Sequence, residues 1–556
     1  MRLLYSKKNR LRAINIIFLL LAFAHFANAQ IALPNGVARF PQSLGTLADS
    51  SFYQGYAPMY STVNFENDSS GNKQNIFILA LSRITDFPSH TESFRDHKKV
   101  VYKTQASLLS GTKAGVFPRW ELFFPDNTSD QPFKNFGALR YHPEYGIYTV
   151  MKQDPETKKD RGSLLILDST FHQIDFLHGV IFNTHDYQLL KLPNGNWNII
   201  TCAENPPTYF DSLDMNYEIN SWEYEHSELK RQLWKCGPTV KTIDSAEWVT
   251  LATGCAAHPG MFNNLTGYNG PHDMFHENSA QAFPWSKDSL LVAISEQNTN
   301  KIRFWWIVDS SGISVTRGMF RFGSVTDFYS DFTFPDNPDF KINKGHSFSI
   351  LGKYQNTIFA SFFDNEVCNS DLSARGLILS IDLYKRECKL LQQNTDGCRS
   401  VAAGNMHVML SQTPPATPTS ILNANRCINW GMPDPGNLPG CFETTVMNPA
   451  GKTIVGITVT DLEYHKYHPM VNSDYQSQAW YQLPIPSRPI TYTIKGDSVI
   501  LKTNFVSPTW ITGATTSTIT LPIHKKGEPV VTIWVRGKTD ETMVGELWEN
   551  INLPSK

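Results

Sequence analysis

The chain has 556 residues and a mass of 62.9 kDa, with 41% hydrophobic, 12% aromatic and 18% charged residues. This length and composition allow a large core and exclude a mostly disordered chain, and average usage of Gly (34) and Pro (33) excludes a collagen-like one. The net charge of −2 comes with no basic run of the kind that binds nucleic acid. The first 29 residues hold five of the 49 basic side chains and no acidic one, so the rest of the chain is acidic.

Residues 1–29 have the pattern of a secretory signal peptide. The five basic side chains precede an apolar run that extends from Ile14 to Phe26, and Ala27-Asn28-Ala29 supplies a cleavage site before Gln30. The run is too short for a transmembrane helix, and no later segment approaches the roughly 18 apolar residues that such a helix needs. An uncleaved anchor is the alternative. The pattern favours an exported protein without a membrane span, either periplasmic or extracellular.

The eight cysteines all follow this predicted signal peptide, and none belongs to a Cys-x-x-Cys pair. A zinc ribbon or a thioredoxin-type site is therefore not indicated. An even number of cysteines in an oxidising compartment favours disulfides. Connectivity does not follow from sequence; proximity suggests the pairs Cys388–Cys398 and Cys427–Cys441.

Short strands are predicted along most of the chain from segments of β-branched and bulky residues. Several of these segments run into an Asp-led turn. The clearest examples are Ile147–Val150, Leu164–Ser169, Phe304–Gly312 and Leu377–Asp382. The amphipathic helices that a parallel α/β sheet would need are missing from the pattern. An all-β fold is expected.

A longer element recurs among these strands: a histidine begins an apolar strand, which passes through a turn into a second strand. It starts at His185, His276 and His346, and a weaker copy starts at 405–407. Hairpins that recur at a loose, long period are typical of a β-propeller whose blades carry loop insertions. Because the innermost strand of every blade runs along the central channel, we expect the three histidines to meet at one mouth of that channel.

Three histidines at one mouth could also hold a metal ion, and each could instead be an ordinary histidine near a turn. The amide of Asn278, two residues after His276, argues against a metal site because amides are poor ligands for transition metals. We therefore predict no metal ligand and no cofactor.

The ordered motifs resemble the arylsulfate sulfotransferases. The resemblance extends over roughly residues 130 to 460, and the ordered set is much more specific than any one motif. The motifs are H-D-x-Q-L-L-x-L-P-N-G-N at 185–196, D-x-x-H-x-N-S at 273–279, D-S-L-L-V at 288–292, G-H-S-F at 345–348 and R-G-L-I-L-S-I-D at 375–382. The resemblance implies a six-bladed propeller that moves a sulfuryl group from a phenolic sulfate ester to a phenolic acceptor without a nucleotide cofactor.

The resemblance also implies catalytic roles. His346 falls on the family's covalent histidine, so the reaction would be ping-pong through a sulfo-histidine. His185 and His276 would hydrogen-bond the sulfuryl oxygens or protonate the departing phenolate, and Asn278 would donate from its amide. The family has an arginine at the position of Ser295, so a fixed cation is missing there.

Two other functions remain open at this stage. One is a non-catalytic exported propeller that binds an aryl or sugar ligand, and the other is a metal-dependent hydrolase. Four aromatic residues in or beside the motifs could stack on an aryl substrate or pack between blades. They are Tyr187, Phe275, Trp285 and Phe348. The expected partners are an aryl sulfate donor and a phenolic acceptor, and a homodimer is one option for assembly.

The last part of the chain changes character after the proline-rich segment 484–489. It is rich in Thr and Val, and Pro508–Thr520 resembles a stretch of the Ig-like modules of exported bacterial proteins. The segment is short for a full sandwich, so a β-rich cap on the propeller is the alternative. The predicted organisation is a signal peptide (1–29), an N-terminal β-rich region (30–130), a propeller (131–483) and a C-terminal β-rich segment (484–556).

Overall fold

The computed structural model describes most of the chain after the predicted signal peptide. The described residues are 37–40, 59–68, 75–80, 105–112, 115–123, 139–153, 161–181, 186–205, 216–236, 277–296, 300–310, 313–323, 330–342, 345–365, 373–395, 400–402, 404–410, 416–433, 444–459, 477–523 and 532–553. The chain divides into two units, and the second, Ala38–Lys556, contains almost all of these residues. The signal peptide lies outside them and stays a prediction.

Four antiparallel sheets of four strands each follow one another in chain order. The first contains β6 (Leu139–His142), β7 (Ile147–Gln153), β8 (Arg161–Leu167) and β9 (Gln173–Ile181). The second contains β10 (Tyr187–Lys191), β11 (Trp197–Asn205), β12 (Asn216–Glu225) and β13 (Glu228–Cys236). The third contains β14 (Glu277–Ser286), β15 (Ser289–Glu296), β16 (Lys301–Ser310) and β17 (Ile313–Phe322). The fourth contains β18 (His346–Tyr354), β19 (Thr357–Asp364), β20 (Arg375–Asp382) and β21 (Glu387–Asn394).

Two larger sheets combine strands from distant parts of the chain. The six-stranded sheet has the order β1-β2-β27-β26-β24-β23 and the seven-stranded sheet the order β28-β3-β4-β5-β34-β33-β31. The strands of the former are β1 (Val37–Phe40), β2 (Met59–Val63), β23 (Asn405–Val408), β24 (Arg426–Asn429), β26 (Thr444–Met447) and β27 (Thr453–Val459). Those of the latter are β3 (Ile76–Ala80), β4 (Gln105–Thr112), β5 (Gly115–Phe123), β28 (Gln478–Trp480), β31 (Val506–Trp510), β33 (Thr532–Lys538) and β34 (Glu546–Asn552). Early strands therefore pair with late ones in both sheets.

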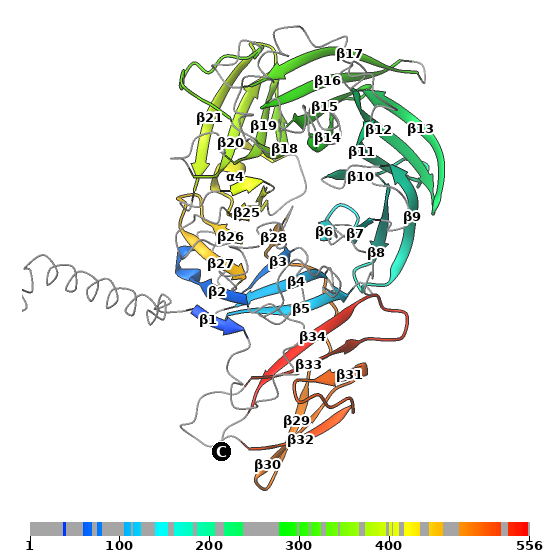
Figure 1. The fold of residues 1–556 in the computed structure, drawn as a ribbon, viewed down its shortest axis with the longest axis vertical. Coiled ribbons are helices and arrows are strands. Elements are labelled where there is room, and N and C mark those ends of the chain that lie inside the picture. The colour runs from blue at the N-terminus through cyan, green and yellow to red at the C-terminus, as the bar shows by residue number, and fades with distance from the viewer. Residues whose placement is uncertain are drawn as a thin grey trace, which may run out of the picture. The chain divides into compact units, whose positions relative to one another are not determined.

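These sheets follow one another around a common centre, with β10 and β14 on the inner side and β13 and β17 on the outer side (Figure 1). The strand at the inner end of each sheet is β6, β10, β14, β18, β23 or β28, and we call these the inner strands. Each sheet packs against the next, and the β28 sheet returns to the β6 sheet through a contact of β3 with β6. Because both faces of a sheet are covered by its neighbours, central strands such as β19 are buried along their length. The fold is all-β and propeller-like.

Side chains link the inner strands in a closed series. The Gln188 amide donates to Ala282 O at 3.0 Å and accepts from Ala282 N at 2.8 Å. Gln281 makes the same pair of hydrogen bonds with the backbone of Ile350. Asn405 makes it with Ser477, donating to the carbonyl at 2.9 Å and accepting from the N–H at 2.8 Å. The remaining links are Ser347 to Gly404 O, Gln478 to Tyr141 N and Arg140 to Tyr187 O. Each inner strand is thus hydrogen-bonded to the next one around the centre.

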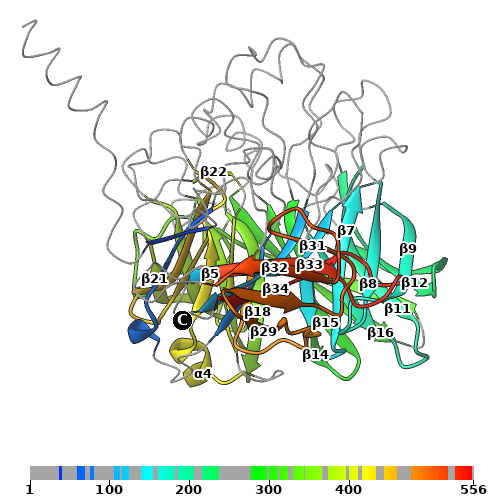
Figure 2. The same cartoon turned by 90° about the horizontal axis from the view of Figure 1, so that it is seen from below.

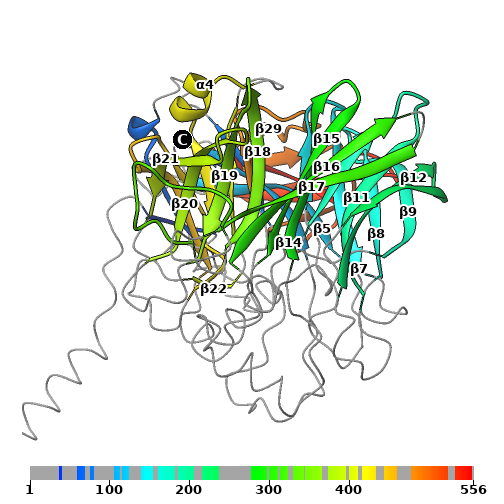
Figure 3. The ribbon, with the colours of Figure 1, turned by 90° about the horizontal axis from the view of Figure 1, so that it is seen from above.

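Shorter elements complete the described structure. They are the 3₁₀ turn η3 (Phe65–Asn67), helix α4 (Pro418–Asn423), the pair β22 (Ser400–Ala402) and β25 (Met432–Pro433), and a three-stranded sheet of β29 (Thr491–Lys495), β30 (Ser498–Lys502) and β32 (Thr518–Pro522). Helix α4 starts at a capping box in which Thr417 and Ser420 bond each other's backbone. Figures 2 and 3 place α4 and β22 at opposite edges of the strands. Within the described ranges, no helix has the length and apolarity needed to cross a bilayer.

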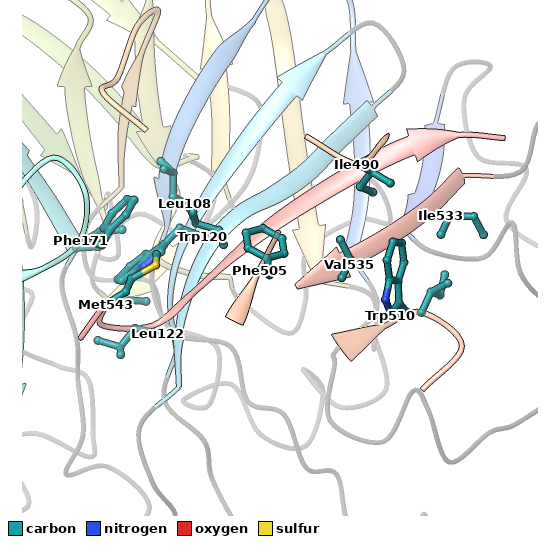
Figure 4. Packing of buried hydrophobic residues seen from close by; sticks show 14 of the residues in the cluster. Leu108, Trp120, Leu122, Phe171, Ile490, Phe505, Trp510, Ile533, Val535 and Met543 are labelled. Atoms are coloured by element: carbon teal, nitrogen blue, oxygen red, sulfur yellow. The ribbon is translucent and has the colours of Figure 1, made fainter. Parts of the chain in front are cut away.

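The C-terminal strands share a core with the early strands β4 and β5. Trp120 on β5 stacks on Phe171, with ring centroids 4.5 Å apart, and its indole N–H donates to Val544 O at 2.9 Å. Figure 4 shows Met543 beside these two rings and Trp510 near Val535 and Ile533. Residues of the segment predicted as 484–556 are therefore packed into the same hydrophobic cluster as β4 and β5.

The predicted strands and hairpins are confirmed. The four segments named from sequence lie in β7, β8, β16 and β20. Asp168 and Asp382 accept backbone N–H groups of the turns that follow their strands. The recurring elements form the pairs β10–β11, β14–β15, β18–β19 and β23–β24. Each pair starts at an inner strand.

The cysteine predictions are tested only in part. Cys202, Cys236, Cys388 and Cys427 are buried, and no disulfide joins two of these four. Cys388 is a free thiol, which does not fit the predicted pair with Cys398. Burial raises the pKa of the Cys388 thiol, so it stays protonated and unreactive. The other four cysteines lie outside the described residues, and Cys427–Cys441 stays a prediction.

Candidate functional site

The two predicted site residues that the structure describes both lie at β-bulges where inner strands begin. His346 pairs with Phe363, but the next pair in the ladder is Ser349 with Ser361. Ser347, between them, has a φ of 52°, a left-handed conformation that is costly for a residue other than glycine. On β14 the register shifts between Glu277 and Ser279, so Asn278 is the extra residue. Bulges redirect side chains and are frequent beside active sites.

Asn365, directly after β19, fixes the tautomer of His346. Its side chain is buried, and Nδ1 lies 2.5 Å from Oδ1 of Asn365. Asn365 is oriented in turn by its Nδ2, which donates to Oγ of Ser400 at 2.8 Å. Because an amide oxygen can only accept, the proton of the neutral imidazole is on Nδ1. The lone pair is then on Nε2, the atom that would act as nucleophile or base.

Asn278 and His346 are brought together through Gly345. The carbonyl oxygen of Gly345 accepts from Nδ2 of Asn278 and from Oγ of Ser295, both at 3.4 Å. A Cβ atom at position 345 would lie 1.9 Å from the Phe362 ring, so only glycine fits there. Asn278 and Ser295 therefore position the backbone that leads into His346.

The structure also shows where the charges near this site are. Ser295, where the arylsulfate sulfotransferases have an arginine, is buried, and its hydroxyl donates to the Gly345 carbonyl. Arg303 and Glu296 form an ion pair in which both side chains are fully buried. Arg303 is thus engaged by a carboxylate, and Glu296 has its charge balanced by that pair rather than presenting it to a substrate.

A central cavity of about 1100 Å³ lies between the inner strands. All six inner strands contribute to its wall, including Ser347, the residue after His346. The wall also contains a buried cation, Arg140, whose guanidinium pairs with Asp186 and lies 4.2 Å from the centre of the Tyr187 ring. Asp186 directly follows His185 in the sequence.

Two further histidines line the cavity that the sequence analysis did not assign to the site. Nε2 of His142 is hydrogen-bonded to Oγ1 of Thr149 at 2.9 Å. Burial, together with the nearby charge of Arg140, lowers the pKa of His142 to about 3. Burial lowers the pKa of His407 to about 4; its Nδ1 accepts from Ala479 N at 3.3 Å. His142 belongs to no repeated motif, so only the three-dimensional structure reveals it. His407 was visible as the weaker fourth repeat.

The other predicted residues have mixed outcomes. His185, His276 and Phe275 lie outside the described residues, so the meeting of three histidines stays a prediction. Tyr187 lines the cavity and bonds Thr149 through its hydroxyl at 2.6 Å. Phe348 is buried and packs on Phe304 and Phe362.

Trp285 packs edge-on against Trp306, with Lys353 above its ring. For Phe348 and Trp285 packing within and between sheets is the observed role.

No protein-family model matches the chain, and no curated protein matches its sequence. Among solved structures, an α-L-arabinanase from Penicillium chrysogenum shows 10% identity and a TM-score of 0.31 over 69% of this chain and 92% of its own. A periplasmic gluconolactonase from Pseudomonas aeruginosa shows 8% identity and a TM-score of 0.30 over 86% of this chain and 100% of its own. Likeness of this degree carries no argument about activity.

Proposed function

We propose that the protein is an exported aryl sulfotransferase that transfers a sulfuryl group through His346. The observation that carries the proposal is the contact of His346 Nδ1 with Asn365, because it leaves the lone pair on Nε2. The bulge and the left-handed Ser347 support it, since such strain persists only where the surrounding structure enforces it. The order of sequence motifs that resembles the arylsulfate sulfotransferases supplies the chemistry.

The reaction we propose has two balanced steps. In the first, Nε2 of His346 attacks sulfur, an N–S bond forms, the S–O bond to the aryl group breaks and the phenolate leaves. In the second, the oxygen of an acceptor phenol attacks the same sulfur, the N–S bond breaks and the phenolic proton passes to a base. Nothing is oxidised or reduced. His185 and His276 are the proposed acid and base for the phenolic oxygens.

Charge on the transferring group needs stabilisation by fixed donors. Ser295 stands where the arylsulfate sulfotransferases have an arginine, so we assign the stabilisation of the sulfuryl oxygens to hydrogen-bond donors, His185 and His276, as the resemblance implies. Asn278, whose Nδ2 donates to Gly345 O, is the third donor that we propose for the sulfuryl oxygens, again from the resemblance.

We also propose that the six inner strands mark six blades of a propeller, as the family resemblance implies. The closed series of side-chain contacts among the inner strands supports this number. In this arrangement the C-terminal segment 484–556 is an addition to the β28 blade through the pairing of β34 with β5.

The test is release of p-nitrophenol from p-nitrophenyl sulfate by the purified chain, with and without phenol as acceptor. We expect release that rises with acceptor and is lost in His346→Asn. A chelator should have no effect. Release that ignores the acceptor but stops with chelator would instead indicate a metal-dependent hydrolase. No turnover in a folded protein would favour a ligand-binding propeller.

A further inference from the structure

The wall of the central cavity carries several carboxamide side chains that are already immobilised. Gln188 and Gln281 each use one N–H and one oxygen lone pair on the backbone of the next inner strand, and Gln478 accepts from Tyr141 N at 3.1 Å. A carboxamide has two N–H groups and two lone pairs. The geometry therefore leaves further donors and acceptors on groups that line the cavity and have lost their rotational freedom before any ligand arrives.

Trp480 adds a donor without a partner. Its indole Nε1 is buried, and no hydrogen-bond acceptor for it exists among the described residues. The ring is held between His407, with centroids 4.9 Å apart, and Tyr141, at 5.5 Å. A buried N–H group without an acceptor is costly, so a side-chain shift that brings it to a bound oxygen atom would be favourable. Trp480 lines the same cavity as the three glutamines.

The cavity offers little net charge to a ligand. Arg140 is paired with Asp186 across the wall. His142 and His407 have pKa values lowered to about 3 and about 4 by burial, so both are neutral near pH 7. Desolvation raises the pKa of Glu144, which weakens its tendency to ionise. A ligand that both donates and accepts hydrogen bonds without carrying charge fits this wall best.

We propose that the central cavity binds an uncharged sugar, whose hydroxyl groups pair with the amides of Gln188, Gln281 and Gln478 and accept from the indole N–H of Trp480. Hydroxyl groups match amides because each can donate and accept. The C–H faces of a pyranose ring would pack on Leu190 and Leu351, which also line the cavity. His346 is not in the wall, so this site and the proposed sulfuryl transfer stand or fall separately.

The experiment measures binding of cellobiose, maltose and lactose to the full chain by saturation-transfer NMR and calorimetry. Galacturonate and p-nitrophenol are the anionic and aromatic comparisons. We expect at least one disaccharide to bind and Trp480→Phe to weaken it roughly five- to tenfold, as loss of one hydrogen bond does. The matched control is Trp222→Phe, because Trp222 also has a buried indole N–H without a partner but lies on β12, away from the cavity.

His346→Asn should bind the sugar as the unchanged chain does, which separates this proposal from the sulfotransferase reaction. Absence of binding by all three disaccharides would overturn the proposal. So would binding confined to galacturonate or p-nitrophenol, or equal weakening by the two tryptophan variants. Folding of each variant is checked by its thermal unfolding midpoint.

Discussion

In the reaction that we propose, the contact between Asn365 and His346 determines which imidazole nitrogen carries the attacking lone pair. The amide oxygen accepts the Nδ1 proton at 2.5 Å, and the hydrogen bond from Asn365 Nδ2 to Ser400 Oγ fixes the orientation of the amide. Asn365 does not need to touch the substrate to matter, so it is a positioning residue. Without it, the proton could move to Nε2 and remove the attacking lone pair.

We therefore predict that Asn365→Leu lowers kcat for aryl sulfate turnover roughly 100-fold or more, with KM little changed. Asn365→Asp, which keeps an oxygen for the Nδ1 proton, should retain most of the activity. Steady-state kinetics of both variants checks this. An equal loss in the two variants, or a change in KM alone, would show that Asn365 has only a structural role.

Gly345 shows how tightly the backbone before His346 is held. A methyl group there would overlap the Phe362 ring at 1.9 Å. Gly345→Ala should lower the free energy of unfolding by about 1–3 kcal/mol, the usual cost of overpacking. Urea denaturation measures this, and a second change, Phe362→Leu, should restore part of the loss in the double variant. No loss in the single variant would contradict the close approach.

At the scale of the elements, amide side chains join one inner strand to the next. Gln188 makes two hydrogen bonds to the backbone of Ala282, so replacing it leaves both backbone groups without those partners. Gln188→Leu should reduce the free energy of unfolding by about 1–3 kcal/mol. Gln173→Leu, at an exposed position of β9, is the control and should cost much less. Similar urea midpoints for the two variants would contradict this role.

The turn between β10 and β11 depends on a buried carboxylate. Glu223 on β12 accepts from Arg231, Asn196 and Asn194 at 2.7 to 2.8 Å, and these bonds lower its pKa from 4.5 to about 2. A lowered carboxyl pKa contributes stability that is fully present above the unfolded value and is lost as pH falls through the folded value.

The free energy of unfolding should therefore differ most between the unchanged chain and Glu223→Gln above about pH 5. The difference should shrink steadily from about pH 4.5 towards pH 2. Urea denaturation of the two proteins across this range provides the measurement. A difference that does not depend on pH would mean that the charge of Glu223 is not what anchors the turn.

At the scale of the whole molecule, local patterns predicted the strands but not how the sheets are completed. Segments such as Leu377–Asp382 are short runs of β-branched and bulky residues that end at a turn-forming residue. This pattern depends on neighbouring residues alone, so β20 could be predicted from sequence. The pairing of β2 with β27 and of β3 with β28 joins residues hundreds of positions apart, and no local signal encodes it. Strands from residues 30–130 accordingly belong to the same sheets as strands from later parts of the chain.

The candidate site, too, could be predicted from sequence only where local patterns determine it. His346 could be named because it begins a recurring hairpin, whereas the roles of His346 and Asn278 were implied by the family resemblance. That Gly345 joins them, and that Asn365 orients the imidazole, depends on bulges and on contacts between sheets. Trp480 and His142 have no motif at all and share the cavity only because β28 and β6 are adjacent inner strands.

The most direct test of sulfuryl transfer is the intact mass of the chain at neutral pH after incubation with p-nitrophenyl sulfate and no acceptor. We predict a species heavier by one sulfuryl group, mapped to His346, that disappears when phenol is added and never forms in His346→Asn. A chain that releases p-nitrophenol without ever carrying the group, or that carries it at another residue, would contradict the account.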